Sequence, residues 1–216
     1  MNKKYELTNE TVEYLGHTLH RIVALKDFSD VKAGDKGGYI ESEDNLDQTG
    51  YAWVYDDAKV CMRAKVIGNA AVKKTAAVFG DAILTQNAKV SGNACIYGTT
   101  HICGRARVGG DSTVYDSANI RDKAKVYNAS IGGQAVIAGN AAITSANDLM
   151  VVGPFKRSRY ISFYRTNDGG IGVNYKEFKG TLSEFMGFIM DLVEHAPHKS
   201  EVFTTAAELA KLKLGE

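Results

Sequence analysis

Two side chains in the middle of this 216-residue sequence have types that can do chemistry, and they stand two residues apart: His101 and Cys103. In an extended strand, residues i and i+2 point to the same side, so the imidazole and the thiol are predicted to be neighbours. Histidine suits proton transfer near neutral pH, which makes His101 a weak catalytic candidate. A zinc site needs three or four ligands, and the residues expected beside this pair supply no strong one. We therefore predict no metal and no cofactor.

Basic side chains recur at an interval of eighteen residues, at Lys89, Arg107 and Lys125, with Lys73 nearby. Further along the chain, a short cluster adds Lys156, Arg157 and Arg159. Like charges that lie close together repel unless something offsets them. One interpretation is a solvated face whose charges discourage aggregation. The other is a site for an anionic partner, such as an acidic protein surface, a nucleotide or a nucleic acid.

An apolar set follows the same interval of eighteen residues, at Cys61, Phe79, Tyr97 and Tyr115. Stacked on one exposed face, these side chains would form an apolar patch, which usually marks a contact surface. Three interpretations stay open. In the first, the C-terminal helix covers the set or the rings stack on one another. In the second, the set is a self-association interface. In the third, it binds another protein.

The interval of eighteen follows from a six-residue repeat that begins at Ala52. Each unit has a small residue and, two positions later, an aliphatic one, and all sixteen units obey this rule, with one residue dropped before Ala129. The aliphatic positions are Val54, Val60, Val66, Val72, Val78, Leu84, Val90, Ile96, Ile102, Val108, Val114, Ile120, Val126, Ile131, Ile137 and Ile143. Each unit is thus a very short strand with both apolar side chains directed inward.

The repeat also predicts where the chain turns. Eight of the sixteen units have Gly two positions after the aliphatic residue, and four more have Asp or Asn there. These residue types tolerate the positive φ that a sharp corner needs. The repeat contains no Pro, which would remove an N–H from a strand ladder. We therefore predict a mainly β solenoid of stacked parallel strands.

This pattern resembles the hexapeptide-repeat family, in which an aliphatic residue precedes a small one by four positions, as from Val66 to Ala70 and from Val90 to Ala94. The resemblance implies a left-handed parallel β-helix with triangular coils of three hexads, here a little over five coils. It also implies a homo-oligomer, a trimer or dimer. Carbonic anhydrases of this family need three histidines, and the repeats hold His101 alone. Acyltransferases of this family use a histidine base, usually beside a loop that interrupts the coils, and this repeat has no inserted loop.

A second resemblance covers roughly residues 19–57. The segment from Asp27 to Ile40 reads DFSDVKAGDKGGYI, and the segment from Ala52 to Asp56 reads AWVYD. Together they are similar to the opening of YdcK-like hexapeptide-repeat proteins and of many phage and prophage proteins. The resemblance implies a shared architecture and carries no established activity.

The remaining sequence divides the chain into three parts. Residues 1–45, which are net acidic, are expected to form an N-terminal β cap, with a strand around 19–25 and a turn at Gly37-Gly38. Residues 46–146, net basic, are the β-helix. Residues 147–216, with balanced charge, are expected to form a small α+β domain of a hairpin and two helices. Thr181-Leu182-Ser183-Glu184 is a capping box for the first helix, and Pro197 is expected to end it.

Composition limits the other function classes. A net charge of +1 argues against a generic nucleic-acid binder. No apolar run approaches the roughly 18 residues of a membrane span, and the first ten residues lack the apolar core of a signal peptide, so we expect a cytoplasmic protein without membrane association. An odd count of three cysteines argues against a disulfide framework.

The leading hypothesis is a non-enzymatic binding protein: a capped β-helix that displays flat faces and self-associates. In its sharper form, the protein is phage-encoded and acts as an inhibitor in the bacterial host cell, binding a defence protein or its nucleotide signal. The alternatives are an acyltransferase-like enzyme that uses His101, and a structural component of a phage particle.

Overall fold

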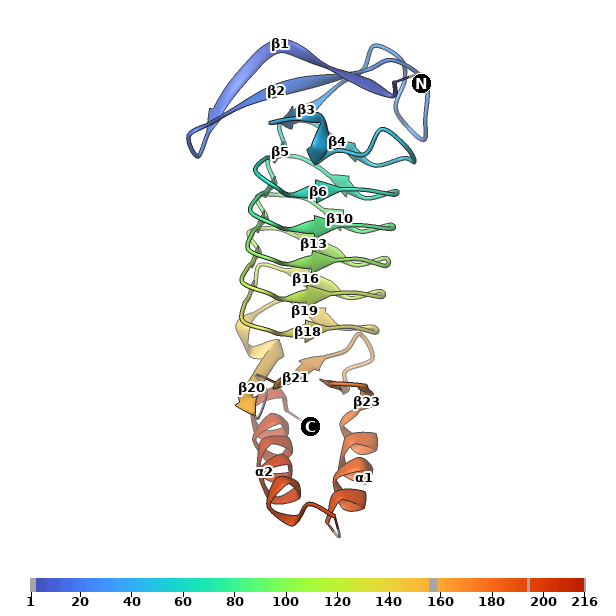
Figure 1. Cartoon of the computed structure of the whole chain (residues 1–216). Coiled ribbons are helices and arrows are strands. Elements are labelled where there is room, and N and C mark those ends of the chain that lie inside the picture. Colours follow the sequence, from blue (N-terminus) through green and yellow to red (C-terminus); the bar gives the residue numbers. More distant parts are fainter. Residues whose placement is uncertain (1–2, 156–158, 194, 216) are drawn as a thin grey trace.

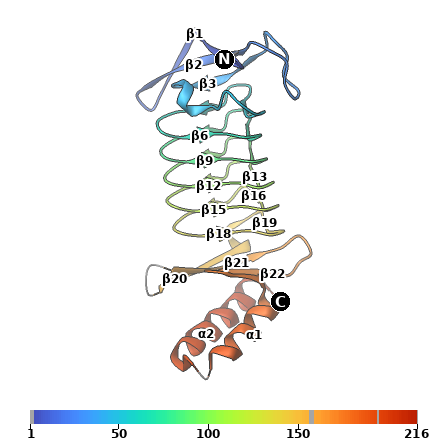
Figure 2. The same cartoon turned by 45° about the vertical axis from the view of Figure 1, so that its right-hand side comes forward.

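The computed structural model describes residues 3–155, 159–193 and 195–215. The chain forms a rod with an N-terminal cap at one end, a stack of coils in the middle, and a small sheet with two helices at the other end (Figures 1 and 2). The predicted fold class is confirmed: the molecule is mainly β, with a parallel solenoid of about six turns.

The cap is an antiparallel pair, β1 (Tyr5–Tyr14) and β2 (His17–Ala24), followed by β3 (Lys36–Ile40), which joins it to the first coil. The expected turn at Gly37-Gly38 is wrong, because both glycines lie inside β3. A Cβ on Gly37 would meet Ile22 Cγ1 and the carbonyl oxygen of Val54 at 2.6 Å. Close packing, and not a turn, explains this glycine pair.

Three parallel sheets form the sides of the solenoid, and each coil adds one strand to each sheet. The aromatic face contains β5 (Lys59–Val60), β8 (Ala77–Val78), β11 (Cys95–Ile96), β14 (Thr113–Val114) and β17 (Ser130–Ile131). The basic face contains β4 (Trp53–Val54), β7 (Ala71–Val72), β10 (Lys89–Val90), β13 (Arg107–Gly109), β16 (Lys125–Tyr127) and β19 (Ala142–Ile143). The mixed face contains β6 (Lys65–Val66), β9 (Ile83–Leu84), β12 (His101–Ile102), β15 (Asn119–Ile120) and β18 (Val136–Ile137).

The core of the solenoid consists of the small and aliphatic positions of the repeat. All sixteen aliphatic side chains are buried, and so are the small residues that precede them. The corner residue has positive φ in fifteen of the sixteen units, and at Met62, Lys74 and Gln86 this occurs without Gly, Asn or Asp. The geometry of the coil therefore imposes the left-handed corner even on residues that ordinarily avoid it.

The C-terminal unit has a four-stranded antiparallel sheet and two helices. The strands are β20 (Leu149–Phe155), β21 (Arg159–Arg165), β22 (Ile171–Tyr175) and β23 (Phe178–Thr181). The helices are α1 (Leu182–Leu192) and α2 (Pro197–Leu214), and short 3-10 turns lie at Glu43–Asn45 and Ala146–Asp148. The hairpin and the capping box are as predicted. Pro197 begins the second helix at a position that needs no N–H donor, so its expected role is corrected.

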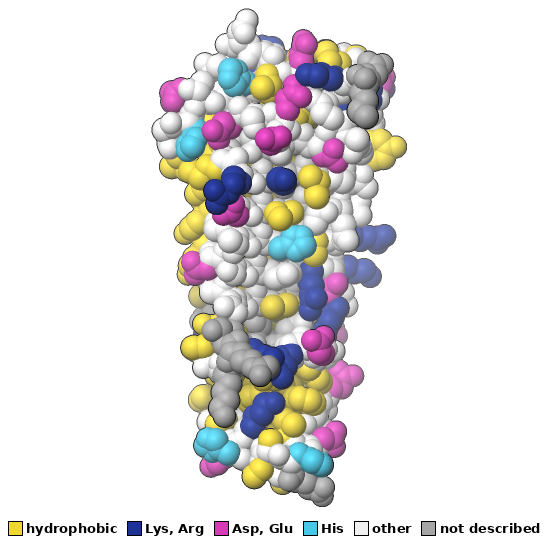
Figure 3. Space-filling view, in the orientation of Figure 1, with side chains coloured by type: hydrophobic (Ala, Val, Ile, Leu, Met, Phe, Trp, Pro, Cys, Tyr) yellow, Lys and Arg dark blue, Asp and Glu magenta, His cyan; other side chains and the backbone are white. Residues whose placement is uncertain are grey.

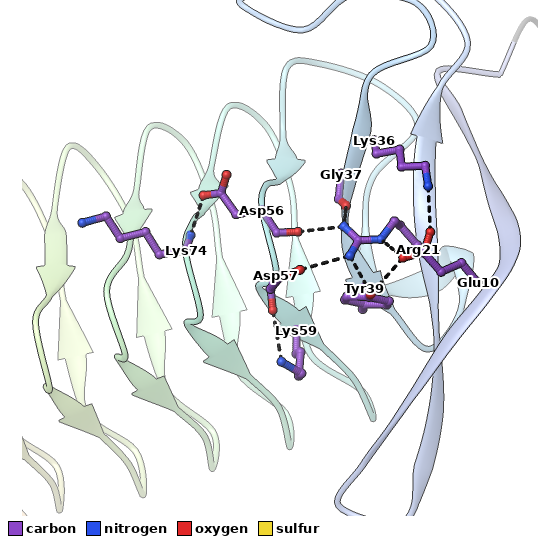
Figure 4. Close-up of polar contacts among 9 residues, drawn as sticks. All are labelled: Glu10, Arg21, Lys36, Gly37, Tyr39, Asp56, Asp57, Lys59 and Lys74. Atoms are coloured by element: carbon purple, nitrogen blue, oxygen red, sulfur yellow. Dashed lines mark hydrogen bonds and ion pairs between the residues drawn. The ribbon is translucent and has the colours of Figure 1, made fainter.

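The two ends are attached to the solenoid by specific side chains. In the cap, Arg21 donates to Gly37 O at 2.8 Å and to Asp57 Oδ1 at 3.0 Å, and Tyr39 and Glu10 hold the same guanidinium (Figure 4). At the other end, Lys179 forms an ion pair with Asp122. Among the described residues, no helix is long and apolar enough to cross a membrane.

Candidate functional site

The basic face carries a ladder of three cations, which we call the basic ladder: Lys89, Arg107 and Lys125. Lys89 pairs with Arg107, and Arg107 with Lys125, as Cα partners on adjacent parallel strands. Neighbouring strands lie about 4.8 Å apart, so the Cα atoms of the three residues follow the axis of the rod at that spacing. All three side chains are exposed, and none forms an ion pair with any residue that the structure describes. The predicted register is confirmed.

Two further cations flank the ladder. Arg105 and Lys123 lie two residues before Arg107 and Lys125, in the turns that lead into β13 and β16, and both are exposed. Sequence analysis missed them because the equivalent corner positions of the neighbouring coils are asparagines. A search for cations at i and i+2 would have found them. In the view of Figure 3, Lys and Arg side chains gather over the lower half of the solenoid and the junction below it.

The carboxylate next to these cations is already engaged. Asp122 accepts from the Gly139 N–H at 2.8 Å and from Lys179 of the C-terminal sheet. Burial alone would raise the pKa of Asp122, but these two contacts outweigh it, and the net shift is downward. Asp122 is therefore ionised and held by the C-terminal unit, which leaves the ladder uncompensated within the described part of the chain.

The other predicted cations do not join the ladder. Lys73 lies on the basic face, but its Nζ is 3.8 Å from Asp30 Oδ2 and 3.8 Å from the centre of the Tyr55 ring. Arg159 lies on β21, at the junction with the mixed face. Lys156 and Arg157 lie outside the described residues. Of the described cations in this set, Lys73 contacts Asp30 and Arg159 lies at the junction, so neither extends the ladder.

The aromatic face carries the predicted stack of rings. Phe79 and Tyr97 are parallel within 5° at 5.2 Å between centroids, and Tyr97 and Tyr115 lie within 19° at 5.8 Å. All three rings are half-buried. Cys61, at the head of the column, is completely buried, and burial raises the pKa of its thiol to about 11. Cys61 therefore offers no surface to a partner, while the three rings do.

The stack ends against the chain itself. Beyond Tyr115, the equivalent position is Gly132, where a Cβ would lie 2.2 Å from Tyr115 Cζ. The glycine thus provides the space in which the last ring lies. This geometry favours the interpretation of a ladder that packs within one chain, and a second copy of the chain on this face stays a prediction.

His101 and Cys103 lie on the mixed face, as predicted. His101 pairs in register with Ile83 on one side and Asn119 on the other. No group of three metal-ligating side chains occurs among the residues described. Burial raises the pKa of the Cys103 thiol, which disfavours its reactive thiolate form. The two residues are neighbours, but the described surroundings do not complete a catalytic or metal-binding set.

Comparisons with known proteins agree with this architecture and add little about activity. No protein-family model matches the chain. A segment of 59 residues, 27% of the chain, is 41% identical to the protein named "Uncharacterized acetyltransferase YdcK" of Escherichia coli (strain K12). The match covers 18% of that protein, far less than two thirds of its length. The solenoid and this partial match together fit a hexapeptide-repeat protein.

Proposed function

We propose that this protein is a binding protein without enzymatic activity, and that its basic ladder captures an acidic surface of a partner protein. The observation that carries the proposal is the register of Lys89, Arg107 and Lys125, three exposed cations on consecutive coils with no carboxylate bonded to them among the described residues. A row of fixed charges on a rigid sheet is preorganised for a partner with complementary charges.

The energetics support a partner on this face. Two unit charges 4.8 Å apart repel by about 1 kcal/mol in a medium with the dielectric constant of water, and by several times more at a partly desolvated surface. Carboxylates of a bound partner would relieve this repulsion. The ladder therefore weakens the free solenoid slightly and strengthens the complex, with an association rate that falls as salt is added.

A protein surface suits the ladder better than a nucleic acid. The net charge of the whole chain is +1, and the acidic cap lies on the same rod. A polynucleotide lying along the rod would contact both the basic ladder and the acidic cap, whereas a compact acidic patch on a protein would contact the ladder alone. The resemblance of residues 19–57 to phage and prophage proteins supports a bacterial host protein, such as a defence component, as the partner, and the protein would then act as its inhibitor.

The test compares two charge reversals of equal size. Arg107→Glu/Lys125→Glu alters the ladder, and Lys26→Glu/Lys65→Glu changes the net charge equally at exposed sites elsewhere. Each variant and the native chain are used as bait in bacterial lysate, and captured proteins are quantified by mass spectrometry. We expect an acidic protein whose capture is lost with the ladder variant, is kept with the control and weakens with salt. Capture that survives the ladder reversal, or recovery of nucleic acid in place of protein, contradicts the proposal.

An acyltransferase is the second candidate, and one observation favours it. His101 lies in register with Asn119, which lines a cleft at the junction with the C-terminal sheet, so a substrate in that cleft would lie one strand from an imidazole. The protein that matches part of the chain is also named as an acetyltransferase. Acetyl-CoA turnover that disappears in His101→Ala, with folding preserved, would support this candidate against the binding protein.

A further inference from the structure

The junction between the last coils and the C-terminal sheet contains a polar cleft of about 590 Å³. We call it the junction cleft. The mixed face contributes Asn119 and Arg121 to its wall, and the C-terminal unit contributes Arg159, Asn174 and Lys176. The cleft thus lies between two parts of the chain that are far apart in sequence, which is a common place for a ligand site.

Two residues that line the cleft each have one buried polar atom without a partner. Arg121 Nε and Asn119 Oδ1 have no hydrogen-bond partner among the described residues. Arg121 Nη2 donates to Asn174 Oδ1 at 3.3 Å, and this bond orients the guanidinium. An unpaired buried donor or acceptor costs about 1–3 kcal/mol. Among the described residues, Asn174 is the one hydrogen-bond partner of the Arg121 guanidinium, so its remaining Nη N–H groups are available to acceptor oxygens of a ligand in the cleft.

The charge of the cleft wall selects the sign of the ligand. Arg121, Arg159 and Lys176 line the cleft, and Glu177 is the one carboxylate among its described lining residues. Guanidinium groups match carboxylate and phosphate oxygens with two parallel hydrogen bonds. The polar cleft therefore favours a carboxylate or a phosphate.

An apolar cavity of about 710 Å³ adjoins the junction cleft and shares Arg159, Tyr175 and Lys176 with it. Its wall includes Phe203 and Val202 of α2. The Tyr175 and Phe203 rings meet edge to face at 4.9 Å between centroids. A hydrocarbon or aromatic body fits this wall. Its burial would contribute roughly 25 cal/mol of binding free energy per Å² of apolar area.

We propose that the junction binds a small amphiphilic anion. Arg121 and Arg159 hold its carboxylate or phosphate head group, and the apolar cavity holds its aliphatic or aromatic body. Because Arg159 and Tyr175 line both cavities, one molecule can reach from the polar to the apolar wall. This site is separate from the basic ladder, so it does not depend on the partner proposed above.

The test uses two fluorescent probes with the same aromatic body. 8-Anilinonaphthalene-1-sulfonate carries an anionic group, and N-phenyl-1-naphthylamine lacks it. The full-length native chain is titrated with each probe. We expect saturable binding of the sulfonate, displaced by decanoate and by decyl phosphate. Arg121→Met and Arg159→Met are each expected to weaken it at least tenfold, with little effect on the neutral probe.

Controls separate this site from general stickiness. Arg105→Met removes an exposed arginine outside both cavities and is expected to leave sulfonate binding unchanged. Val202→Asp places a charge in the apolar wall and is expected to weaken both probes. If Arg121→Met fails to fold by circular dichroism, Arg159→Met and Lys176→Met decide. Equal binding of the two probes, equal loss in Arg105→Met, or sulfonate binding that survives the cleft variants overturns the proposal.

Discussion

Tyr14, the last residue of β1, packs the edge of its ring against Phe79 of the aromatic face, with 6.3 Å between centroids and 70° between planes. The first strand pair of the cap therefore reaches down along the solenoid and covers the first ring of the stack. Lys59 Nζ lies 5.7 Å from the centre of the Tyr14 ring and makes a second contact with it. The cap thus closes the end of the core and also one end of the aromatic column.

Tyr14→Ala is expected to lower the free energy of unfolding by about 1–2 kcal/mol. The substitution removes an edge-to-face aromatic pair and the apolar area that the ring covers on Phe79. Chemical denaturation followed by circular dichroism measures the change. Tyr51→Ala is the matched control, because Tyr51 is 57% exposed, and its loss is expected to change stability by less than about 0.5 kcal/mol. Equal effects of the two variants would mean that the contact contributes nothing.

Tyr97→Asp tests whether the aromatic face joins copies of the chain. If it does, the native protein has a mass that is a multiple of 23.4 kDa by light scattering, and a carboxylate in the middle of the stack reduces it to that of one chain. Tyr115→Asp should act in the same way, and Tyr51→Asp should not. A native protein that is monomeric at every concentration tested removes the interface and leaves the rings as an internal ladder.

The repeat is predictable because its information is local. Sixteen units, each with an inward pair at i and i+2, determine the position of each strand, of each corner and of the register between coils. The register in turn predicts that Lys89 lies beside Arg107. The contacts of the two ends depend on docking between segments that share no period. Nothing in the sequence pairs Arg121 with Asn174, because Arg121 lies in the repeat and Asn174 lies outside it. The junction cleft was missed for that reason.

Individual residue types were also ambiguous. A Gly-Gly pair predicts a turn on composition alone, yet at positions 37 and 38 the glycines lie in a strand that approaches the first coil closely. A proline is compatible both with the end of one helix and with the start of the next, and the structure places Pro197 at the start of α2. Met62 has positive φ, although its type gives no sign of a corner. In each case, tertiary contacts determine the local conformation, which the residue type alone does not.

Gly37→Ala and Gly187→Ala are expected to change stability in opposite directions. An added Cβ at Gly37 meets Ile22 Cγ1 and Val54 O at 2.6 Å, so we expect a loss of several kcal/mol or failure to fold. At Gly187, in α1, a Cβ meets nothing within 4 Å, so the helix gains about 0.5–1 kcal/mol. Thermal unfolding of the two variants beside the native chain gives both signs. A neutral Gly37→Ala would show that β3 can move away from the first coil.

Glu10 is expected to make stability depend on pH in the acid range. Its Oε2 accepts from Lys36 Nζ at 2.9 Å and its Oε1 from Arg21 Nε at 2.6 Å, and these bonds lower the pKa of Glu10 to about 2. A depressed carboxyl pKa stabilises the folded chain fully above the ordinary value, near 4.3, and this contribution is lost as the pH falls toward 2. In Glu10→Gln, the denaturation midpoint should therefore change less between pH 5 and pH 2 than it does in the native chain. Glu6→Gln, on the same strand and without an ion pair among the described contacts, should keep the native slope. If Glu10→Gln keeps that slope too, the ion pairs of Glu10 with Lys36 and Arg21 do not stabilise the folded chain.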